Sequence, residues 1–174
     1  MMTYLKWIVG AVVVLAIGLG LYWTLPSRDV VRILGTEIAR RSVETENAQG
    51  ETVSRTQDVR YIKAVTPDGE PRVYRNEDTG WGWPPYFKFD SANLAAEADN
   101  LTSSEADPRW VVVTHYGWRI PLLSKFPNAT SLKPADGPDP TLIPWFNIAV
   151  VVVLIVLVLI ARHQVISFFR PKRT

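Results

Sequence analysis

The fold is decided by two apolar stretches, WIVGAVVVLAIGLGLYWTL over Trp7–Leu25 and LIPWFNIAVVVVLIVLVLIA over Leu142–Ala161. They contain 19 and 20 residues, and neither holds an Asp, Glu, Lys, Arg or His. A helix needs about 20 apolar residues to cross a bilayer, so both stretches have the length of a membrane span. The chain of 174 residues is therefore predicted to be a membrane protein and not a soluble enzyme.

The distribution of charge predicts the orientation of these spans. The central segment, residues 26–141, contains all 17 acidic residues and 14 of the 19 basic residues, which gives it a net charge of −3. Lys and Arg beside a span are retained in the cytoplasm, whereas a long loop crosses largely regardless of its charge. We therefore expect both termini in the cytoplasm and the central segment outside it. The orientation-setting residues are Lys6, Arg162, Arg170, Lys172 and Arg173.

The spans divide the chain into five expected segments. The first apolar run could instead be a cleaved signal peptide, but it exceeds the usual apolar region of about 7–15 residues and no A-x-A site follows, so an uncleaved anchor is expected. The segments are a cytoplasmic tail (1–6), a first transmembrane helix (7–25), an extracytoplasmic domain (26–141), a second transmembrane helix (142–161) and a basic cytoplasmic tail (162–174).

Two further patterns accompany the spans. Aromatic side chains near their ends are typical of membrane interfaces, and small residues in the first span would let another helix approach closely. Alternatively, glycine is simply common in transmembrane helices. The expected interface anchors are Tyr4, Trp7, Tyr22, Trp23, Trp145 and Phe146, and the expected helix-packing residues are Gly10, Ala16, Gly18 and Gly20.

The central segment is predicted to be a small, mostly β domain. β-branched runs separated by turn residues indicate five strands, and apolar residues at helical spacing indicate one helix between the third and fourth strands. This order is that of an OB-type barrel, with an antiparallel α+β sheet as the alternative. The polar stretch Ser42–Gln57 is expected to be a long loop or a hairpin tip. The expected elements are strands Asp29–Arg41, Asp58–Val65, Arg72–Glu77, Arg109–Tyr116 and Ala129–Lys133, and the helix Ser91–Ser103.

The most distinctive stretch is YRNEDTGWGWPPYFKFDSANL, Tyr74–Leu94. Together with HYGWR (His115–Arg119), FPNATSLKP (Phe126–Pro134) and LIPWFN (Leu142–Asn147), it resembles a family of bacterial inner-membrane proteins known only as a domain of unknown function. The resemblance implies a two-span protein of the bacterial inner membrane, which would place the central domain in the periplasm. It implies no activity.

Five aromatic residues within this stretch, broken by glycines and prolines, have three interpretations. They could plug the barrel and pack beneath the helix, as large aromatics commonly do in cores. They could form an exposed platform for a partner protein, or stack on a sugar or lie on the outer leaflet. The residues are Trp81, Trp83, Tyr86, Phe87 and Phe89.

Groups that could carry catalysis are sparse. The chain has no cysteine, which excludes thiol nucleophiles and Cys-ligated zinc. His115 is the only histidine in the central segment, and no G-x-S-x-G motif accompanies it. Glu77 and Asp78 would point to opposite faces of a strand, and no Ca²⁺-loop pattern surrounds them. We therefore expect no enzyme activity, no catalytic residue, no cofactor and no metal.

The expected function is that of an interaction module, an accessory or assembly subunit of a bacterial inner-membrane complex. Its contact surfaces would be the aromatic segment, the helix faces, His115 and Trp118. The expected partners are the lipid bilayer and another membrane protein. Nucleic acid is not expected, because the central segment is acidic and phosphate binding requires positive charge. The alternative is a periplasmic receptor for a glycan, a peptidoglycan fragment or a peptide.

Overall fold

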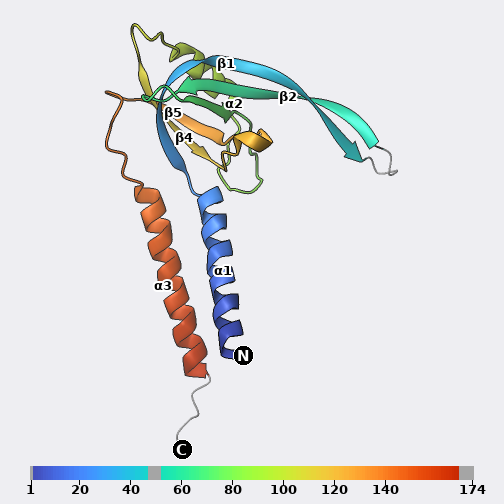
Figure 1. Cartoon of the computed structure of the whole chain (residues 1–174), viewed down its shortest axis with the longest axis vertical. Helices are drawn as coiled ribbons and strands as arrows, with labels where there is room; N and C mark the ends of the chain where they lie inside the picture. Colours follow the sequence, from blue (N-terminus) through green and yellow to red (C-terminus); the bar gives the residue numbers. More distant parts are fainter. Residues whose placement is uncertain (1, 47–51, 169–174) are drawn as a thin grey trace, which may run out of the picture. The chain divides into compact units, whose positions relative to one another are not determined.

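The structure is a computed structural model that describes residues 2–46 and 52–168. Its contacts divide the chain into two compact units, Met1–Pro140 and Thr141–Thr174. The first contains a β-barrel and two α-helices, and the second contains one long helix (Figure 1). The elements are α1 (Met2–Thr24), β1 (Ser27–Glu46), β2 (Thr52–Val65), β3 (Pro71–Arg75), α2 (Ser91–Asn100), β4 (Trp110–Tyr116), η1 (Pro121–Leu123), β5 (Asn128–Pro134) and α3 (Trp145–Phe168).

Two of the helices, α1 and α3, coincide with the apolar stretches. Their windows Trp7–Thr24 and Trp145–Gln164 are long and apolar enough to cross a membrane, as judged by length and composition. No part of either window is buried within the structure. Neither helix therefore has the buried position of a core helix in a soluble protein.

The five strands form a closed barrel in the order β1–β2–β3–β5–β4. Neighbouring strands are antiparallel except β3 and β5, which are parallel and paired at Arg75 and Asn128. The helix α2 lies between β3 and β4 in the chain. The predicted order of five strands and one helix is thus confirmed.

The first two strands are longer than predicted. The stretch expected to be a long loop or a hairpin tip continues β1 and β2 as a two-stranded ribbon, in which Ser42 pairs with Thr56 and Glu46 with Thr52 (Figure 1). Residues 47–51 of this stretch lie outside the described part of the chain. The register shifts between Ile33 and Gly35, and Gly35 has φ +142°. Such a φ favours glycine, which has no Cβ, and this explains why the irregularity occurs at Gly35.

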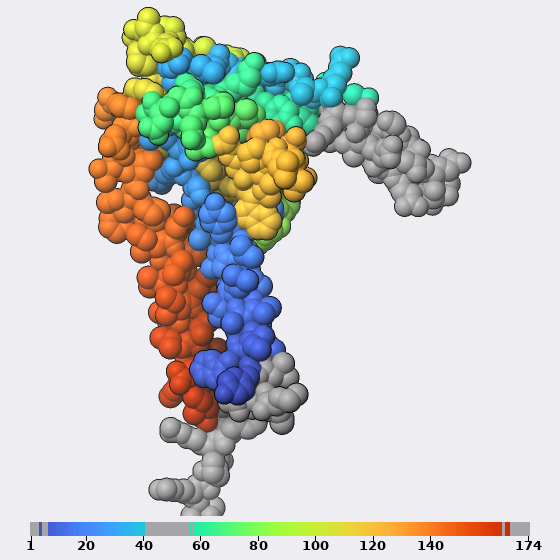
Figure 2. All heavy atoms as spheres, viewed as in Figure 1, coloured from blue at the N-terminus to red at the C-terminus, as the bar shows by residue number. Residues whose placement is uncertain are grey.

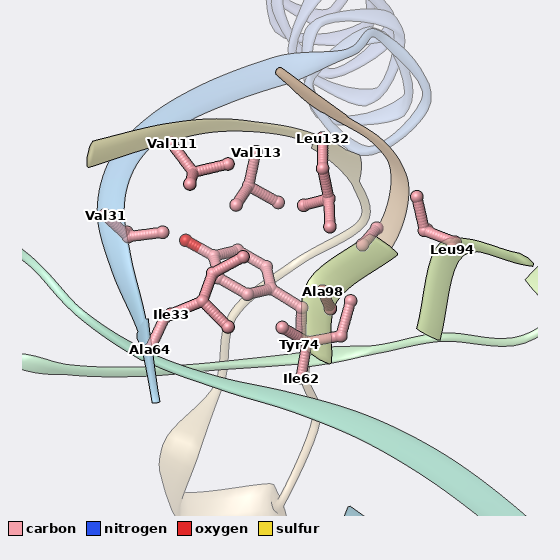
Figure 3. Packing of buried hydrophobic residues seen from close by; sticks show 11 residues of the cluster. Val31, Ile33, Ile62, Ala64, Tyr74, Leu94, Ala98, Val111, Val113 and Leu132 are labelled. Carbon is pink, nitrogen blue, oxygen red and sulfur yellow. The ribbon is translucent and has the colours of Figure 1, made fainter. Parts of the chain in front are cut away.

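The core consists of the inward residues of the barrel strands and the apolar face of α2. Alternate positions of one strand point to the same side, so Val111 and Val113 of β4 face the interior and are 0% exposed. Leu94 and Ala98 of α2 pack against the same cluster, and the Tyr74 ring lies in its middle (Figure 3). The remaining members of the cluster are Val31, Ile33, Ile62, Ala64, Ala129 and Leu132.

Candidate interaction site

The segment that joins β3 to α2, residues 77–90 and here called the aromatic loop, exposes most of its rings. Trp81 is 84% exposed, Trp83 72%, Phe87 52% and Phe89 56%. These four side chains therefore do not plug the barrel. The core is filled instead by aliphatic residues and Tyr74, which leaves no interior position for a further set of large rings.

The ring of Trp81 contacts two other exposed rings, those of Phe87 and Phe89. The ring centroid of Trp81 lies 5.4 Å from that of Phe87 and 5.6 Å from that of Phe89, both at an interplanar angle of 61°. Edge-to-face contacts of this kind are favourable between aromatic rings. We call Trp81, Phe87 and Phe89 the aromatic cluster. A contiguous exposed apolar group is typical of an interaction site, whereas single exposed apolar residues are not.

The fifth ring, Tyr86, fastens the loop to α1 and β4. It stacks on Tyr116 at a centroid distance of 4.5 Å and an interplanar angle of 14°. Its hydroxyl donates a hydrogen bond of 2.6 Å to the carbonyl oxygen of Thr24 in α1. Burial, with a smaller contribution from Tyr116, raises the pKa of Tyr86 to about 12. The phenol therefore stays protonated and remains a donor at neutral pH.

A buried lysine holds the other end of the loop. Lys88 is 4% exposed, and its Nζ donates hydrogen bonds of 2.6 Å to Asn76 Oδ1 and to the carbonyl oxygen of Ala129. Burial lowers the pKa of Lys88 to about 8, although the carboxylates of Asp78 and Asp90 oppose the shift. The lysine links the loop to β5 while Phe87 and Phe89 on either side of it point outward.

The carboxylate of Asp78 caps α2. The backbone N–H of Ser91 donates to Asp78 Oδ1 at 2.8 Å, and the Ser91 hydroxyl donates to Oδ2 at 3.0 Å. The neighbouring Asp90 makes no side-chain cap bond. Within residues 2–46 and 52–168, no group of three or more His, Cys, Asp or Glu side chains could hold a metal ion.

A cleft of about 530 Å³ lies between the aromatic loop and the segment around η1. Figure 2 shows this segment, in orange-yellow, projecting from the face of the barrel. Trp23, in the last turn of α1, also lines the cleft. It packs edge-on against Tyr116 at 6.4 Å, and its carbonyl oxygen accepts a hydrogen bond of 3.0 Å from Gly117. The residues that line the cleft also include Arg75, Glu77, Trp83, Trp118, Leu123 and Lys125.

His115 lies in the barrel interior and not on a contact surface. It is 8% exposed, because it follows Val111 and Val113 on the inward side of β4. Its Nε2 is 3.1 Å from Asp29 Oδ2, to which the Tyr74 hydroxyl donates a bond of 2.7 Å. The prediction that His115 contributes to an exposed contact surface is therefore wrong. Trp118, by contrast, is 40% exposed and lines the cleft.

The predicted residues of the spans are only partly described. Trp23 packs on the barrel, whereas a Cβ added at any of the three α1 glycines would meet no heavy atom of the described residues within 4 Å. Arg162 is exposed on α3. Arg170, Lys172, Arg173 and the Lys6 side chain lie outside the described part of the chain. Most expected interface anchors are exposed, namely Tyr4, Trp7, Tyr22, Trp145 and Phe146. The roles of all these residues, Ala16 included, stay predictions.

Sequence reasoning missed the cleft. Its walls come from α1, the aromatic loop and the segment around η1. More than fifty residues of sequence separate α1 from the loop, and about thirty separate the loop from η1. Hydrophobic periodicity is a local property of the sequence, so it cannot predict that these distant segments line one cleft. The sequence feature that could have indicated the cleft is the pair of tryptophans at positions 83 and 118, each of which follows a glycine in a stretch without strand periodicity.

Comparisons with known proteins give a family but no activity. Residues 2–169 match the family described as "Protein of unknown function (DUF1523)". The chain is 40% identical over 127 residues to an "Uncharacterized protein" of Haemophilus influenzae, a match that covers 71% of each chain. No solved structure matches.

Proposed function

The chain belongs to the DUF1523 family of proteins of unknown function, and from this premise we propose that it is a non-enzymatic interaction module anchored in the bacterial inner membrane. It serves as an accessory or assembly subunit of a membrane complex, and the aromatic cluster is its contact surface for a partner protein. The proposal rests on one observation: three large rings are exposed together on a loop whose flanking residues are held by buried contacts.

The loop's attachments support this role. Tyr86 and Lys88, which alternate with the exposed Phe87 and Phe89, contact α1, β4 and β5 through a ring stack and hydrogen bonds. A surface fixed before binding loses less conformational entropy when a partner docks. Tryptophan is enriched among residues that dominate binding energy. Trp81 is therefore the residue on which partner affinity depends most.

The membrane placement follows from the charges and the two apolar helices. Both termini lie in the cytoplasm and the barrel lies in the periplasm, because the basic residues outside the central segment flank the spans. We further assign the barrel to the OB type, since its strand order and the position of α2 between β3 and β4 fit that architecture.

The test is site-specific photocrosslinking of the full chain in its own membranes. A benzophenone amino acid replaces Trp81, and as a control replaces Ile38, which is 62% exposed on the β1–β2 ribbon. We expect one reproducible protein adduct from position 81 and none of the same mass from position 38. Adducts with lipid alone, or none, at position 81 would contradict the proposal.

A further inference from the structure

The cleft combines aromatic walls with a position at the end of α1. Three of its lining side chains are indoles, those of Trp23, Trp83 and Trp118. Trp23 belongs to the last turn of α1, so in the proposed topology the cleft opens where this helix leaves the bilayer. Tryptophan is enriched at that level because its ring is apolar and its N–H is polar.

Apolar side chains continue the cleft on one side. Leu122 and Leu123 of η1 are 91% and 60% exposed, and Leu123 lines the cleft. Exposed leucines beside an aromatic cleft are unfavourable in water but are stabilised where they contact acyl chains. The exposed leucines beside the cleft therefore favour a lipid, whose acyl chains can contact them, over a soluble polar ligand, which has no acyl chains.

The cleft is also lined by a carboxylate, Glu77, and an ammonium, Lys125, that can each form a further polar contact. Glu77 Oε2 accepts a hydrogen bond from Arg75, whereas Glu77 Oε1 is buried and has no hydrogen-bond partner in the described residues. A buried acceptor without a donor is unfavourable, and the Glu77 side chain, which is 22% exposed, lines the cleft. Lys125, an exposed lysine that also lines the cleft, forms no ion pair with any residue that the structure describes.

We propose that this cleft binds the headgroup of a zwitterionic aminophospholipid of the outer leaflet, an inference that rests on the proposed membrane topology. The ammonium of the headgroup donates to Glu77 and lies against the indole rings, which attract cations through their faces. The phosphodiester binds Lys125 by a charge-assisted hydrogen bond. A volume of about 530 Å³ accommodates a group of this size.

The experiment uses the full chain in detergent and short-chain phosphatidylethanolamine as the probe, with binding followed by tryptophan fluorescence. We expect saturable binding, and a weakening of about tenfold or more in Glu77→Gln and in Lys125→Ala, because each removes a hydrogen bond to a charged group. The matched controls Glu97→Gln and Lys133→Ala change exposed side chains outside the cleft and should bind as the wild type does.

Headgroup chemistry separates the possible ligands. Short-chain phosphatidylglycerol keeps the phosphodiester but lacks the ammonium, and should bind about as weakly as the Glu77→Gln variant binds phosphatidylethanolamine. A soluble dipeptide carries both charges without acyl chains and should not compete. Equal binding of phosphatidylglycerol, competition by the dipeptide, or unchanged affinity in both variants would each overturn the proposal.

The two proposals fail separately. If both cleft variants bind the lipid as the wild type does, while position 81 still crosslinks to a protein, only the headgroup site is wrong. If lipid binding depends on Glu77 and Lys125 but position 81 gives no protein adduct, only the partner-docking role is wrong. Near-ultraviolet circular dichroism shows whether a variant is folded. If Lys125→Ala is unfolded, the test rests on Glu77→Gln, which conserves the shape of the side chain.

Discussion

At the scale of single residues, the position of the aromatic loop depends on Lys88. A buried ammonium is unfavourable unless its donors are satisfied, and Lys88 satisfies two of them with Asn76 Oδ1 and the Ala129 carbonyl oxygen. Its lowered pKa has a consequence for stability. Between about pH 8 and pH 10.5 the unfolded chain keeps this proton whereas the folded chain releases it.

Stability should therefore rise with pH across that interval. We predict that the free energy of unfolding of the full chain in detergent increases relative to that of Lys88→Met as the pH is raised from about 8 to 10.5. All other groups are common to both proteins, so the difference isolates Lys88. Urea titrations at each pH measure it, and a difference that is constant or shrinks would be inconsistent with a buried, titrating lysine.

The lowered pKa of Asp29 acts in the same direction as that of Lys88, but at acidic pH. Burial raises the pKa of its carboxyl, but the nearby His115 and the hydrogen bond from Tyr74 outweigh burial and bring the pKa below 3.8. The stabilisation from ionised Asp29 is complete above that value and is lost as the pH falls through the folded-state pKa. We predict that the stability advantage of the wild type over Asp29→Asn shrinks below pH 3.8. Thermal unfolding at a series of acidic pH values measures this, and a pH-independent advantage would refute it.

At the scale of elements, the aromatic loop divides into an exposed face and an anchored one. Trp81→Ala removes an exposed ring, and substitutions at exposed positions usually change the free energy of unfolding by less than about 0.5 kcal/mol. Tyr86→Ala removes a ring stack and a hydrogen bond to Thr24. We predict a loss of about 1–3 kcal/mol for Tyr86→Ala.

Denaturant unfolding of the full chain in detergent compares the two variants. The anchored description of the loop fails if Trp81→Ala destabilises the chain as much as Tyr86→Ala does. Tyr86→Phe is the matched control, because it keeps the stack on Tyr116 and loses only the hydrogen bond to the Thr24 carbonyl oxygen. The free energy of unfolding should fall by less than half as much in Tyr86→Phe as in Tyr86→Ala.

The elements differ in how far they could be predicted from the sequence. The strand predicted over Arg109–Tyr116 is observed over Trp110–Tyr116, because its apolar run is unambiguous. The turn between β2 and β3 has Gly69 at φ +82°, as a proline–aspartate–glycine sequence favours.

Other features of the structure could not be predicted, because no local sequence pattern indicates them. The sequence of the β1–β2 ribbon is polar and lacks an apolar alternation, so it predicted a long loop or a hairpin tip and not the extended pairing of β1 with β2. The cap of α2 comes from Asp78, thirteen residues before Ser91, a separation that no local helix-start pattern predicts. Exposure of the aromatic rings could not be predicted either, because the same residue types fill cores and form contact surfaces.

At the scale of the whole molecule, the proposed orientation depends on the separation of charge between the tails and the central segment. The five basic residues outside residues 26–141 have no acidic neighbour in either tail, whereas every carboxylate side chain lies in the segment between the spans. Partner docking at the aromatic cluster and lipid binding in the cleft both require the barrel to face the periplasm.

The absence of cysteine from the sequence makes this placement directly measurable. A single cysteine is introduced at Asp68, in the exposed turn before β3, or at Arg162, near the end of α3. Cells with a permeabilised outer membrane and an intact inner membrane are treated with a membrane-impermeant maleimide. We predict that Asp68→Cys reacts before lysis and that Arg162→Cys reacts only after it. Labelling of Arg162→Cys alone before lysis would contradict the proposed orientation.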